Sequence, residues 1–497
     1  MLSLPCVLYA MDLTVLYLAV PSITRALEPS STQLLWITDI YGFLLAGFLI
    51  PMGTLGDRIG RRRLLLIGAA AFGTVSVGAA FATSAGMLIA ARAVLGVAGA
   101  TLAPSTLSLI RNMFLDPKQR TVAIGVWIAS FSAGSAIGPV VGGVLLNRFW
   151  WGSVFLVGVP VMVLLLVLGP TLLPEFRDPR AGRLDLVSAA MSLTAVLSAI
   201  YGLKRLAQDG LGAVPLLWVI AGLAIGAAFL WRQWTLADPL IDLRLFLAPS
   251  FSVSLATYTL GIFVIFGVSF FTAQYLQLVL GMSPLRAGLW SVPEGVAFVA
   301  ASLLTPVVVR AVRPPFVVAG GFAIAAVGFT LITTVGVGSG LAVVVTGSVV
   351  YALGLAPVAT LATDLIVGTA PPERAGAASA LSETGAEFGG AFGIAILGSL
   401  GTAVYRAVLA DTVPAGVPPG AVGAARDTLG GAVVAANQLP RSVGDPLKVA
   451  ARTAFTQGFR IIAAVAAVIA AGMAVMVLVL LRRVRVSSLE DVEETPV

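Results

Sequence analysis

Long apolar runs, separated by short polar stretches, recur along the whole 497-residue chain. A helix that crosses the hydrocarbon core of a bilayer needs about 20 mostly apolar residues. Fourteen runs reach that length, so the pattern predicts an all-α integral membrane protein with 14 transmembrane helices. The expected ranges are 3–21, 35–55, 64–82, 87–110, 122–146, 152–173, 184–203, 212–231, 251–279, 287–309, 315–334, 341–367, 378–405 and 457–481.

Most linkers between these runs are short, but residues 406–456 form a long one. It contains Pro414, Pro418 and Pro419, followed by the amphipathic stretch PLKVAARTAFTQGF. We expect a long external loop there. No basic stretch or cleavage site precedes the first run, so we expect no cleavable signal peptide.

The composition agrees with lipid as the main solvent. Hydrophobic residues make up 58% of the chain and charged residues 11%, whereas soluble domains carry about 25% charged residues. Histidine is absent and Cys6 is the single cysteine, which excludes disulfides, zinc and iron–sulfur sites and histidine catalysis. No phosphate loop is present. We therefore expect no metal and no cofactor, and proton chemistry falls to carboxylates.

The distribution of basic residues predicts the orientation. If both termini are cytoplasmic, the loops on that side hold 18 Lys and Arg residues, against five in the short external loops, among them Lys204 and Arg205. This is a strong positive-inside bias. The net charge of +7 therefore reflects topology and contact with anionic lipid, and we expect no nucleic-acid partner.

Four acids stand within apolar runs, namely Asp12, Asp39, Glu383 and Glu387. Each costs about 2.5–3.5 kcal/mol at the centre of a membrane helix, so each is a functional candidate. Glu383 and Glu387 are four residues apart and share a helical face, where two carboxylates repel and titrate as a coupled pair. The alternatives are headgroup residues for Asp12 and Asp39, and solvated glutamates at a cavity mouth for the pair.

Three further charges lie in or near apolar runs. Arg92 is expected to be structural, or to tune the ionisation of an acid on a neighbouring helix. Asp364, near the end of its run, is a candidate gate or helix cap. Glu294 follows Pro293, and an extra acid there would add a cation site.

The loop after the second run reads GTLGDRIGRRR (53–63). Gly53 and Gly56 would let helices approach closely, and Gly60 would permit a tight turn. Asp57, among arginines, would form an ion pair that closes in one conformation and breaks in another. The alternative is a plain basic loop. The candidate gating residues are Gly53, Asp57, Arg58, Gly60 and Arg61.

The order G-x-L-x-D-R-x-G-R-R-R in this loop resembles the signature of the major facilitator superfamily of transporters. LIAARAVLGVAGA (88–100), which contains Arg92, resembles the superfamily's fourth-helix motif, and GSAIGPVVGG (134–143) resembles its antiporter motif. Gly134, Gly138 and Gly142 lie on one helical face, which favours close packing against a neighbouring helix. Pro139 can bend that helix.

MDLTVLYLAVP, WITDIYGFLLAG and TDLIVGTAPPERAGAASALSETGAEFGGAFGIAILGSL narrow the resemblance to the fourteen-helix drug:proton antiporter family. It implies a six-helix bundle in residues 1–175, two inserted helices in 176–250, and a second six-helix bundle in 251–497. It also implies alternating access around a central cavity. The resemblance marks Asp12, Asp39, Glu383 and Glu387 as proton- or substrate-linked acids.

A multidrug antiporter of this kind exports lipophilic cations such as dyes, quaternary ammonium biocides and antibiotics, driven by the proton gradient. Aromatic rings beside acids would bind such cations through cation–π contacts, although packing or an interfacial position is the alternative for any one ring. The candidates are Tyr17, Trp36, Tyr41, Trp127, Phe131, Phe271 and Phe388. We expect a monomer in a bacterial cytoplasmic membrane, exchanging more than one proton per monovalent cation.

Other functions remain open at this stage. The same fold could serve one physiological solute, a self-made antibiotic or a lipid, including by uptake. An intramembrane enzyme using Glu383 and Glu387 would lack histidine, a metal motif and a nucleophile with its base, so we expect no enzyme. A non-transporting receptor is the remaining alternative.

Overall fold

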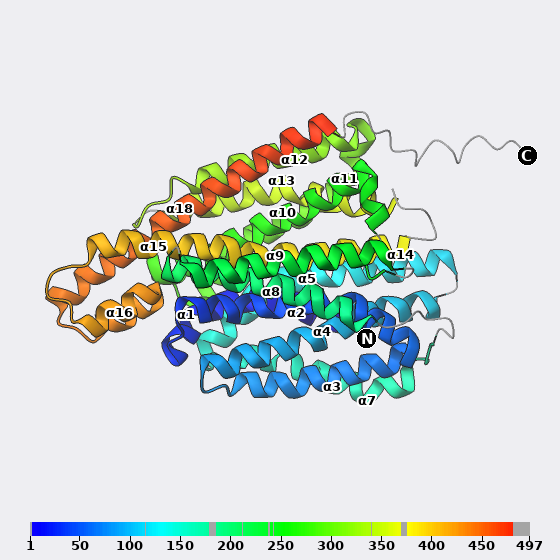
Figure 1. Ribbon diagram of the computed structural model, residues 1–497, viewed down its shortest axis with the longest axis horizontal. Helices are drawn as coiled ribbons and strands as arrows, with labels where there is room; N and C mark the ends of the chain where they lie inside the picture. The colour runs from blue at the N-terminus through cyan, green and yellow to red at the C-terminus, as the bar shows by residue number, and fades with distance from the viewer. Residues whose placement is uncertain are drawn as a thin grey trace, which may run out of the picture.

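The computed structural model describes residues 2–114, 116–177, 185–210, 212–236, 239–241, 243–338, 340–368 and 375–480, and within them it contains helices and no strand (Figure 1). The first half of the chain forms one helical bundle, here called the N-half. Its elements are α1 (Ser3–Leu27), α2 (Ser31–Ile59), α3 (Arg61–Ala80), α4 (Ala85–Met113), α5 (Pro117–Arg148), α6 (Ser153–Leu156) and α7 (Gly158–Leu172).

Two helices, α8 (Leu186–Asp209) and α9 (Ala213–Thr235), follow as a hairpin, and the short 3-10 helix η1 (Leu243–Leu247) leads on from them. The second bundle is the C-half. Its elements are α10 (Pro249–Gln274), η2 (Tyr275–Val279), α11 (Pro284–Ala311), α12 (Pro314–Ile332), α13 (Leu341–Gly368), α14 (Ala375–Phe392), η4 (Gly393–Leu397), α15 (Gly398–Thr412), α16 (Pro419–Asp427), α17 (Leu429–Asn437) and α18 (Arg441–Leu480).

Capping residues stand at the start of several of these helices. Ser30 and Gln33 form a reciprocal capping box at the start of α2, with bonds of 3.0 and 3.2 Å. Asp116 caps α5, where Pro117 occupies the first turn and lacks the N–H that would otherwise be unpaired. Ser283 and Pro284 repeat that arrangement at α11. Such caps satisfy backbone N–H groups that the helix itself leaves unpaired.

Among the described residues, 12 helices are long and apolar enough to cross a membrane, or 13 if the bent helix α1 counts as one span. The expected segment 122–146 lies in α5, a helix of 32 residues with several side chains outside the described part of the chain. The predicted total of fourteen therefore stays a prediction, while a polytopic all-helical fold is confirmed.

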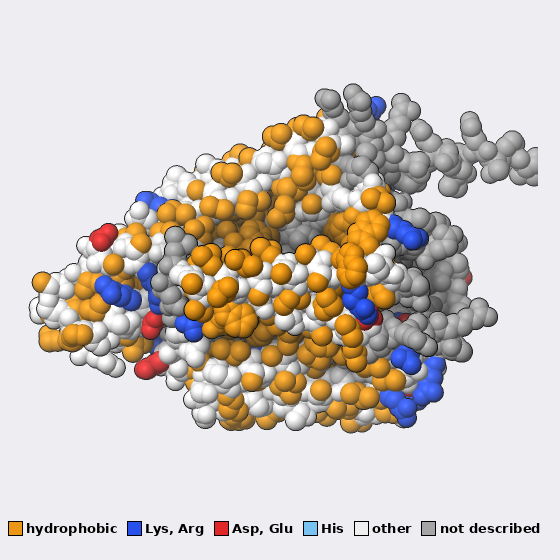
Figure 2. Space-filling model, viewed as in Figure 1, with side chains coloured by type: hydrophobic (Ala, Val, Ile, Leu, Met, Phe, Trp, Pro, Cys, Tyr) orange, Lys and Arg blue, Asp and Glu red, His pale blue; other side chains and the backbone are white. Residues whose placement is uncertain are grey.

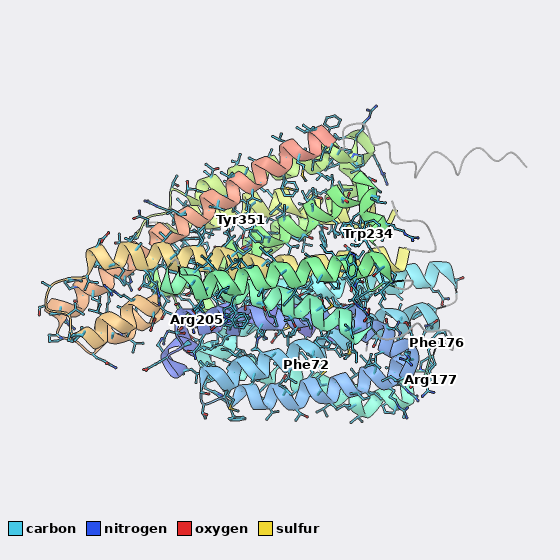
Figure 3. All side chains as sticks on the ribbon, in the orientation of Figure 1. Phe72, Phe176, Arg177, Arg205, Trp234 and Tyr351 are labelled. Carbon is cyan, nitrogen blue, oxygen red and sulfur yellow. The ribbon has the colours of Figure 1, made fainter. Side chains whose placement is uncertain are left out.

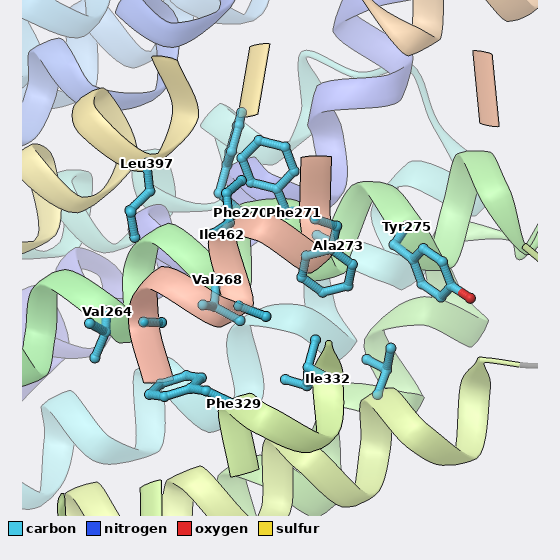
Figure 4. Packing of buried hydrophobic residues seen from close by; sticks show 14 of the residues in the cluster. Val264, Val268, Phe270, Phe271, Ala273, Tyr275, Phe329, Ile332, Leu397 and Ile462 are labelled. Carbon is cyan, nitrogen blue, oxygen red and sulfur yellow. The ribbon is translucent and has the colours of Figure 1, made fainter. Parts of the chain in front are cut away.

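Two large apolar clusters make up most of the buried core. In the N-half, the cluster includes Ile37, Leu65, Phe72 and Leu88. In the C-half, rings from different helices stack, such as Phe271 on Phe455 and Phe459, with centroids 5.4 and 6.4 Å apart. Figure 4 shows part of this second cluster, including Phe271, Phe329 and Ile462. This second cluster also includes Tyr17 and Leu18 of α1 and Leu34 and Leu35 of α2, so it continues across the contact between the halves.

The halves meet along two seams, α2 against α14 and α5 against α11. At the first seam, a Cβ added to Gly42 would lie 3.2 Å from the Ala391 Cβ. At the second, a Cβ added to Gly143 would lie 2.7 Å from the Leu285 Cα. Helices this close leave little room for a substrate between α2 and α14 near Gly42, or between α5 and α11 near Gly143.

The long loop predicted for residues 406–456 is instead mostly helical. Helix α15 continues to Thr412, α16 and α17 fill 419–437, and α18 begins at Arg441. At 1.5 Å per residue, the 40 residues of α18 span about 60 Å, twice the hydrocarbon thickness. The structure therefore adds helices that were not predicted within this linker, while its external position stays a prediction.

These helices project from one end of the molecule, here called the far end, and the opposite end is the terminal end (Figure 1). At the far end, Arg406 pairs with Asp427 at 2.9 Å, and the Tyr405 hydroxyl donates to the Ala425 carbonyl at 2.6 Å. Helix α1 begins and helix α18 ends toward the terminal end (Figure 1), where Figure 2 shows a gathering of Lys and Arg. Arg177 lies there too, whereas Arg205 lies toward the far end (Figure 3).

Candidate functional site

A buried ion pair joins α1 to α4 inside the N-half. The Arg92 guanidinium, which is fully buried, donates to the Asp12 carboxylate, whose side chain is 15% exposed. Arg92 also donates through Nε to the Ile37 carbonyl at 3.2 Å, and its Cζ lies 4.5 Å from the centre of the Tyr41 ring. Asp12 therefore stands beside a resident cation within the membrane.

A hydrogen bond links the two halves at the level of this pair. The Tyr9 hydroxyl of α1 donates to the Glu387 carboxylate of α14. Tyr9 lies one turn before Asp12, and its ring is 6.4 Å from the Tyr41 ring beneath Arg92. A continuous polar and aromatic path thus runs from the C-half glutamate to the N-half ion pair. Glu383 lies one turn before Glu387 on α14 and is half-buried.

Asp39 also has a cation partner, and it comes from the inserted hairpin. Lys204 of α8 places Nζ 2.7 Å from the Asp39 Oδ2, and both side chains are fully buried. The same Nζ lies 3.7 Å from the centre of the Trp36 ring. The placement of Lys204 in an external loop was wrong, because α8 continues to Asp209, beyond the predicted end at residue 203.

The α2–α3 loop contains the predicted gating residues at the terminal end. Arg61 donates through Nε to the Asp57 Oδ1 at 2.8 Å, while Arg58 is exposed. Gly60 has a φ of +112°, a conformation open to glycine but strained for other residues. An added Cβ at Gly53 would lie 4.0 Å from the Cβ of Pro104 on α4, an ordinary van der Waals distance.

A carboxylate from another helix holds the same loop. Glu175, just after α7, accepts from the backbone N–H groups of Arg62 and Arg63 at 3.1 and 3.2 Å. It thereby occupies the position of a cap at the start of α3, where unpaired N–H groups favour negative charge.

The glycines of GSAIGPVVGG pack against α1. A Cβ at Gly134 would overlap the Val7 carbonyl, one at Gly138 would overlap the Thr14 hydroxyl, and one at Gly142 would lie 2.7 Å from the Val15 side chain. The Pro139 carbonyl faces Gly288 of α11 across the second seam. This motif therefore brings α5 against the helix that carries Tyr9 and Asp12.

The candidate aromatic residues have different surroundings. Tyr17 packs edge-on against Phe266 and Phe270, with centroids 6.3 and 6.2 Å apart. The indole N–H of Trp127 donates to Thr106 at 3.0 Å. Phe388 stacks near Phe392, and Phe271 packs in the C-half core. Trp36 and Tyr41 are the two candidates with a cation over the ring. The side chain of Phe131 lies outside the described residues.

Of the remaining charges, Glu294 accepts a 2.7 Å hydrogen bond from the Tyr351 hydroxyl of α13. The side chain of Asp364 lies outside the part of the chain that the structure describes. Asp12 also lines a small cavity inside the N-half, together with Leu8, Phe72 and Phe155. A second cavity, at the far end, lies between the halves and is lined by Leu35, Phe271, Tyr405 and Asp427, among others.

Three functional candidates were missed in the sequence: Tyr9, Lys204 and Tyr351. Each is the partner of a buried acid on another helix. Tyr9 could have been predicted as a partner, because it lies three residues before Asp12 and so shares its helical face. Lys204 was harder to predict; the sequence shows only a lysine within one turn of an apolar run. Nothing in the sequence around Tyr351 indicated that it contacts an acid.

Two helical halves, acids within membrane-spanning helices and a carboxylate at the contact between the halves define a membrane transporter, not an enzyme. The chain belongs to the Major Facilitator Superfamily, whose family model matches residues 2–394.

The chain is 45% identical over 482 residues to the multidrug efflux pump LfrA of Mycolicibacterium smegmatis, covering 97% of this chain and 95% of that one. It is 35% identical over 460 residues to the methyl viologen resistance protein SmvA of Salmonella typhimurium, covering 90% of each. A bacterial homologue of the human lysosomal transporter Spinster, solved in an inward-facing and unoccupied conformation, has a TM-score of 0.69 at 18% identity, covering 97% of this chain and 96% of that chain. The first two likenesses support drug export, and the third shows the fold.

Proposed function

We propose that this chain is a proton-coupled antiporter that exports lipophilic, mostly cationic drugs by alternating access. The observation that carries the proposal is the hydrogen bond between Tyr9 and Glu387. It places an acid of the C-half at the contact between the halves, where its charge can respond to a proton or to a cationic substrate.

The partners of Asp12, Asp39 and Glu387 favour Glu387 as the exchanging group. Asp12 and Asp39 stand beside Arg92 and Lys204, so each of these pairs is neutral overall. The partner that the described structure gives Glu387 is a neutral hydroxyl. A carboxylate without a paired cation attracts either a proton or a cationic drug, and these two ligands compete.

In the proposed cycle, protonation from outside displaces the drug and deprotonation inside permits reloading. Each ligand must favour one conformation, since a ligand that binds both equally shifts no population. Positive charge at the terminal end (Figure 2) supports a cytoplasmic position for that end and for both termini. We assign the protein to a bacterial cytoplasmic membrane, as a monomer.

Names of relatives support the substrate class. LfrA is named as a multidrug efflux pump, and SmvA as a methyl viologen resistance protein. Methyl viologen is a flat, doubly charged quaternary cation, of the kind that a carboxylate and aromatic rings bind together. Dyes and quaternary ammonium compounds share that chemistry.

The driving force constrains the stoichiometry. One proton exchanged for one monovalent cation moves no net charge, and the pH difference then supplies about 1.4 kcal/mol per pH unit. A second proton would add about 2.3 kcal/mol per 100 mV of membrane potential. We propose more than one proton per monovalent cation; export of a monovalent dye that does not depend on voltage would contradict this.

The deciding experiment uses the purified protein in vesicles with an imposed pH gradient and a panel of fluorescent cations. Wild type is compared with Glu387→Gln, which removes the proposed exchanging group, and with Glu383→Gln, its neighbour one helical turn away. Gradient-driven export that both substitutions weaken is the expected result. If neither substitution changes coupled transport of any substrate, the mechanism is wrong. Export of a single compound from the panel would instead favour a transporter dedicated to one solute.

A further inference from the structure

Asp39 and Trp36 together have the chemistry of a binding site for an organic cation. They lie one turn apart on α2, and a single ammonium nitrogen is 2.7 Å from the carboxylate and 3.7 Å from the ring centre. A carboxylate opposite an aromatic face is the usual means of holding an ammonium group away from water. The ammonium in this structure belongs to the protein itself, on Lys204 of the inserted helix α8.

Both charges depend on each other in this position. Asp39 and Lys204 are fully buried, and no side chain in the described part of the chain donates a hydrogen bond to the Asp39 oxygens, so the charge of the nearby ammonium is what compensates this carboxylate. Removing one member of such a pair leaves the other buried without compensation, which is strongly unfavourable. The pair therefore fastens α8 to α2.

The helix that is fastened in this way also touches the other half. Ile200 of α8 shares one apolar cluster with Phe43 of α2, Ala391 of α14 and Ala395 of η4. Helix α8 also contacts α15. It thus lies over the α2–α14 seam, joined to the N-half by an ion pair and in apolar contact with residues of both halves. Apolar contacts are non-directional and allow sliding, whereas the ion pair has one geometry.

We propose that Asp39 and Trp36 form a cation site whose resident occupant is the Lys204 ammonium, and that this tethered cation holds α8 over the α2–α14 seam during export. The inference rests on the proposed export function and assigns the inserted hairpin a part in it. Asp39 then serves to hold α8, and a cationic drug reaches this carboxylate only by displacing Lys204.

Chemical rescue tests the site directly. Lys204→Ala removes the ammonium and leaves space beside Asp39, and we expect export of a fluorescent cation in vesicles to fall at least about tenfold, since the remaining charge is unpaired. Ethylammonium or propylammonium, added at millimolar concentration, should restore export to within about threefold of wild type by filling the site. The matched control Lys204→Ala/Asp39→Asn, which has no carboxylate, should show no response to either amine.

A second variant distinguishes loss of export caused by misfolding from loss of export caused by the missing ion pair. Asp39→Asn/Lys204→Met removes both charges at similar volume, so it should fold as stably as wild type yet export several-fold more slowly, because α8 is no longer fastened. Wild-type export by this double variant, or an amine response that Asp39→Asn does not abolish, would overturn the proposal. Amine-insensitive export by Lys204→Ala would overturn it too. Wild-type vesicles without gradient-driven export would contradict the proposed function instead.

Discussion

The acids of the N-half and those of α14 in the C-half differ in their partners. In the N-half, Asp12 and Asp39 stand beside buried cations, Arg92 and Lys204. In the C-half, Glu387 accepts a hydrogen bond from Tyr9, a residue that carries no charge. Carboxylates within the membrane-spanning part of this protein therefore have two kinds of partner: a buried cation or a neutral hydroxyl.

This difference teaches how a chain without histidine can divide structural from exchangeable charge. A buried ion pair is costly to break, because one partner is left uncompensated. A carboxylate held by a hydroxyl keeps its hydrogen bond in either ionisation state, since a hydroxyl can donate or accept. We therefore expect substitutions that break the Asp12–Arg92 pair to show mainly in stability, and substitutions at Glu387 to show mainly in transport.

The largest expected effect is that of Glu387→Gln. Glutamine keeps the size and still accepts from Tyr9, but it cannot release or take up a proton at any pH. Gradient-driven export should fall to background, while the melting temperature of the purified protein stays close to that of wild type. Export at the wild-type rate would remove the distinction between the halves, and a large loss of stability would place Glu387 with the structural charges.

The opposite pattern is expected for Asp12→Asn. Arg92 would be left fully buried without its carboxylate, and breaking a buried pair costs about 3–5 kcal/mol. Thermal unfolding in detergent should report this loss. Asp12→Asn/Arg92→Gln is the matched control, since it removes both charges and should recover most of the stability. A single variant as stable as wild type would show that Arg92 is not held by Asp12.

Tyr9→Phe probes the contact between the halves. It removes one hydrogen bond to a carboxylate, of a kind worth about 1.5–3 kcal/mol, and export should slow by roughly tenfold with folding intact. Tyr17→Phe is the control on the same helix, because no described residue hydrogen-bonds to the Tyr17 hydroxyl. Equal effects of the two substitutions would mean that the Glu387 contact has no special role.

Gly60→Ala tests whether the N-half loop is structural as well. The φ of +112° is strained for alanine, and the added Cβ would meet the Glu175 carboxylate. The variant should lose about 1–3 kcal/mol of stability. Gly53→Ala is the control, because the added Cβ would make only an ordinary contact, 4.0 Å from the Pro104 Cβ. If Gly53→Ala is the more harmful of the two in thermal unfolding, the backbone argument fails.

The smallest effect, a small loss of stability, is expected from substitution of Asp185, which caps α8 outside the membrane span. Partial burial alone would raise the pKa of this carboxyl, but hydrogen bonds from Ser188 and Arg232 outweigh it and lower the pKa below its usual value. A lowered folded-state pKa contributes stability above the unfolded value, near pH 4, that is lost as pH falls through the folded pKa.

Asp185→Ala should therefore destabilise by about 1 kcal/mol near neutral pH. The gap to wild type should narrow as the pH falls below about 4, as measured by thermal unfolding over a pH series. A gap that is constant with pH would exclude an electrostatic origin, and Asp445→Ala, at an exposed carboxylate, is the control.

Several features of the fold and the candidate site were predictable from local sequence. Asp12, Glu383 and Glu387 stood out because acids inside apolar runs are costly and rare. The glycines of GSAIGPVVGG indicated a close helix contact because their spacing matches one helical face. The helices at 419–437 were missed, since their small residues and prolines resemble those of a loop.

By itself, the sequence determined the membrane-spanning helices, the basic terminal end and the positions of the buried acids. These features depend on the length of an apolar run and on charges near its ends, which are local quantities. The tertiary structure decided which partner each acid has: Tyr9 and Glu387 are 378 residues apart, and Asp39 and Lys204 lie on helices of different parts of the chain. Partner choice depends on packing between distant helices, and no local pattern in one sequence encodes it.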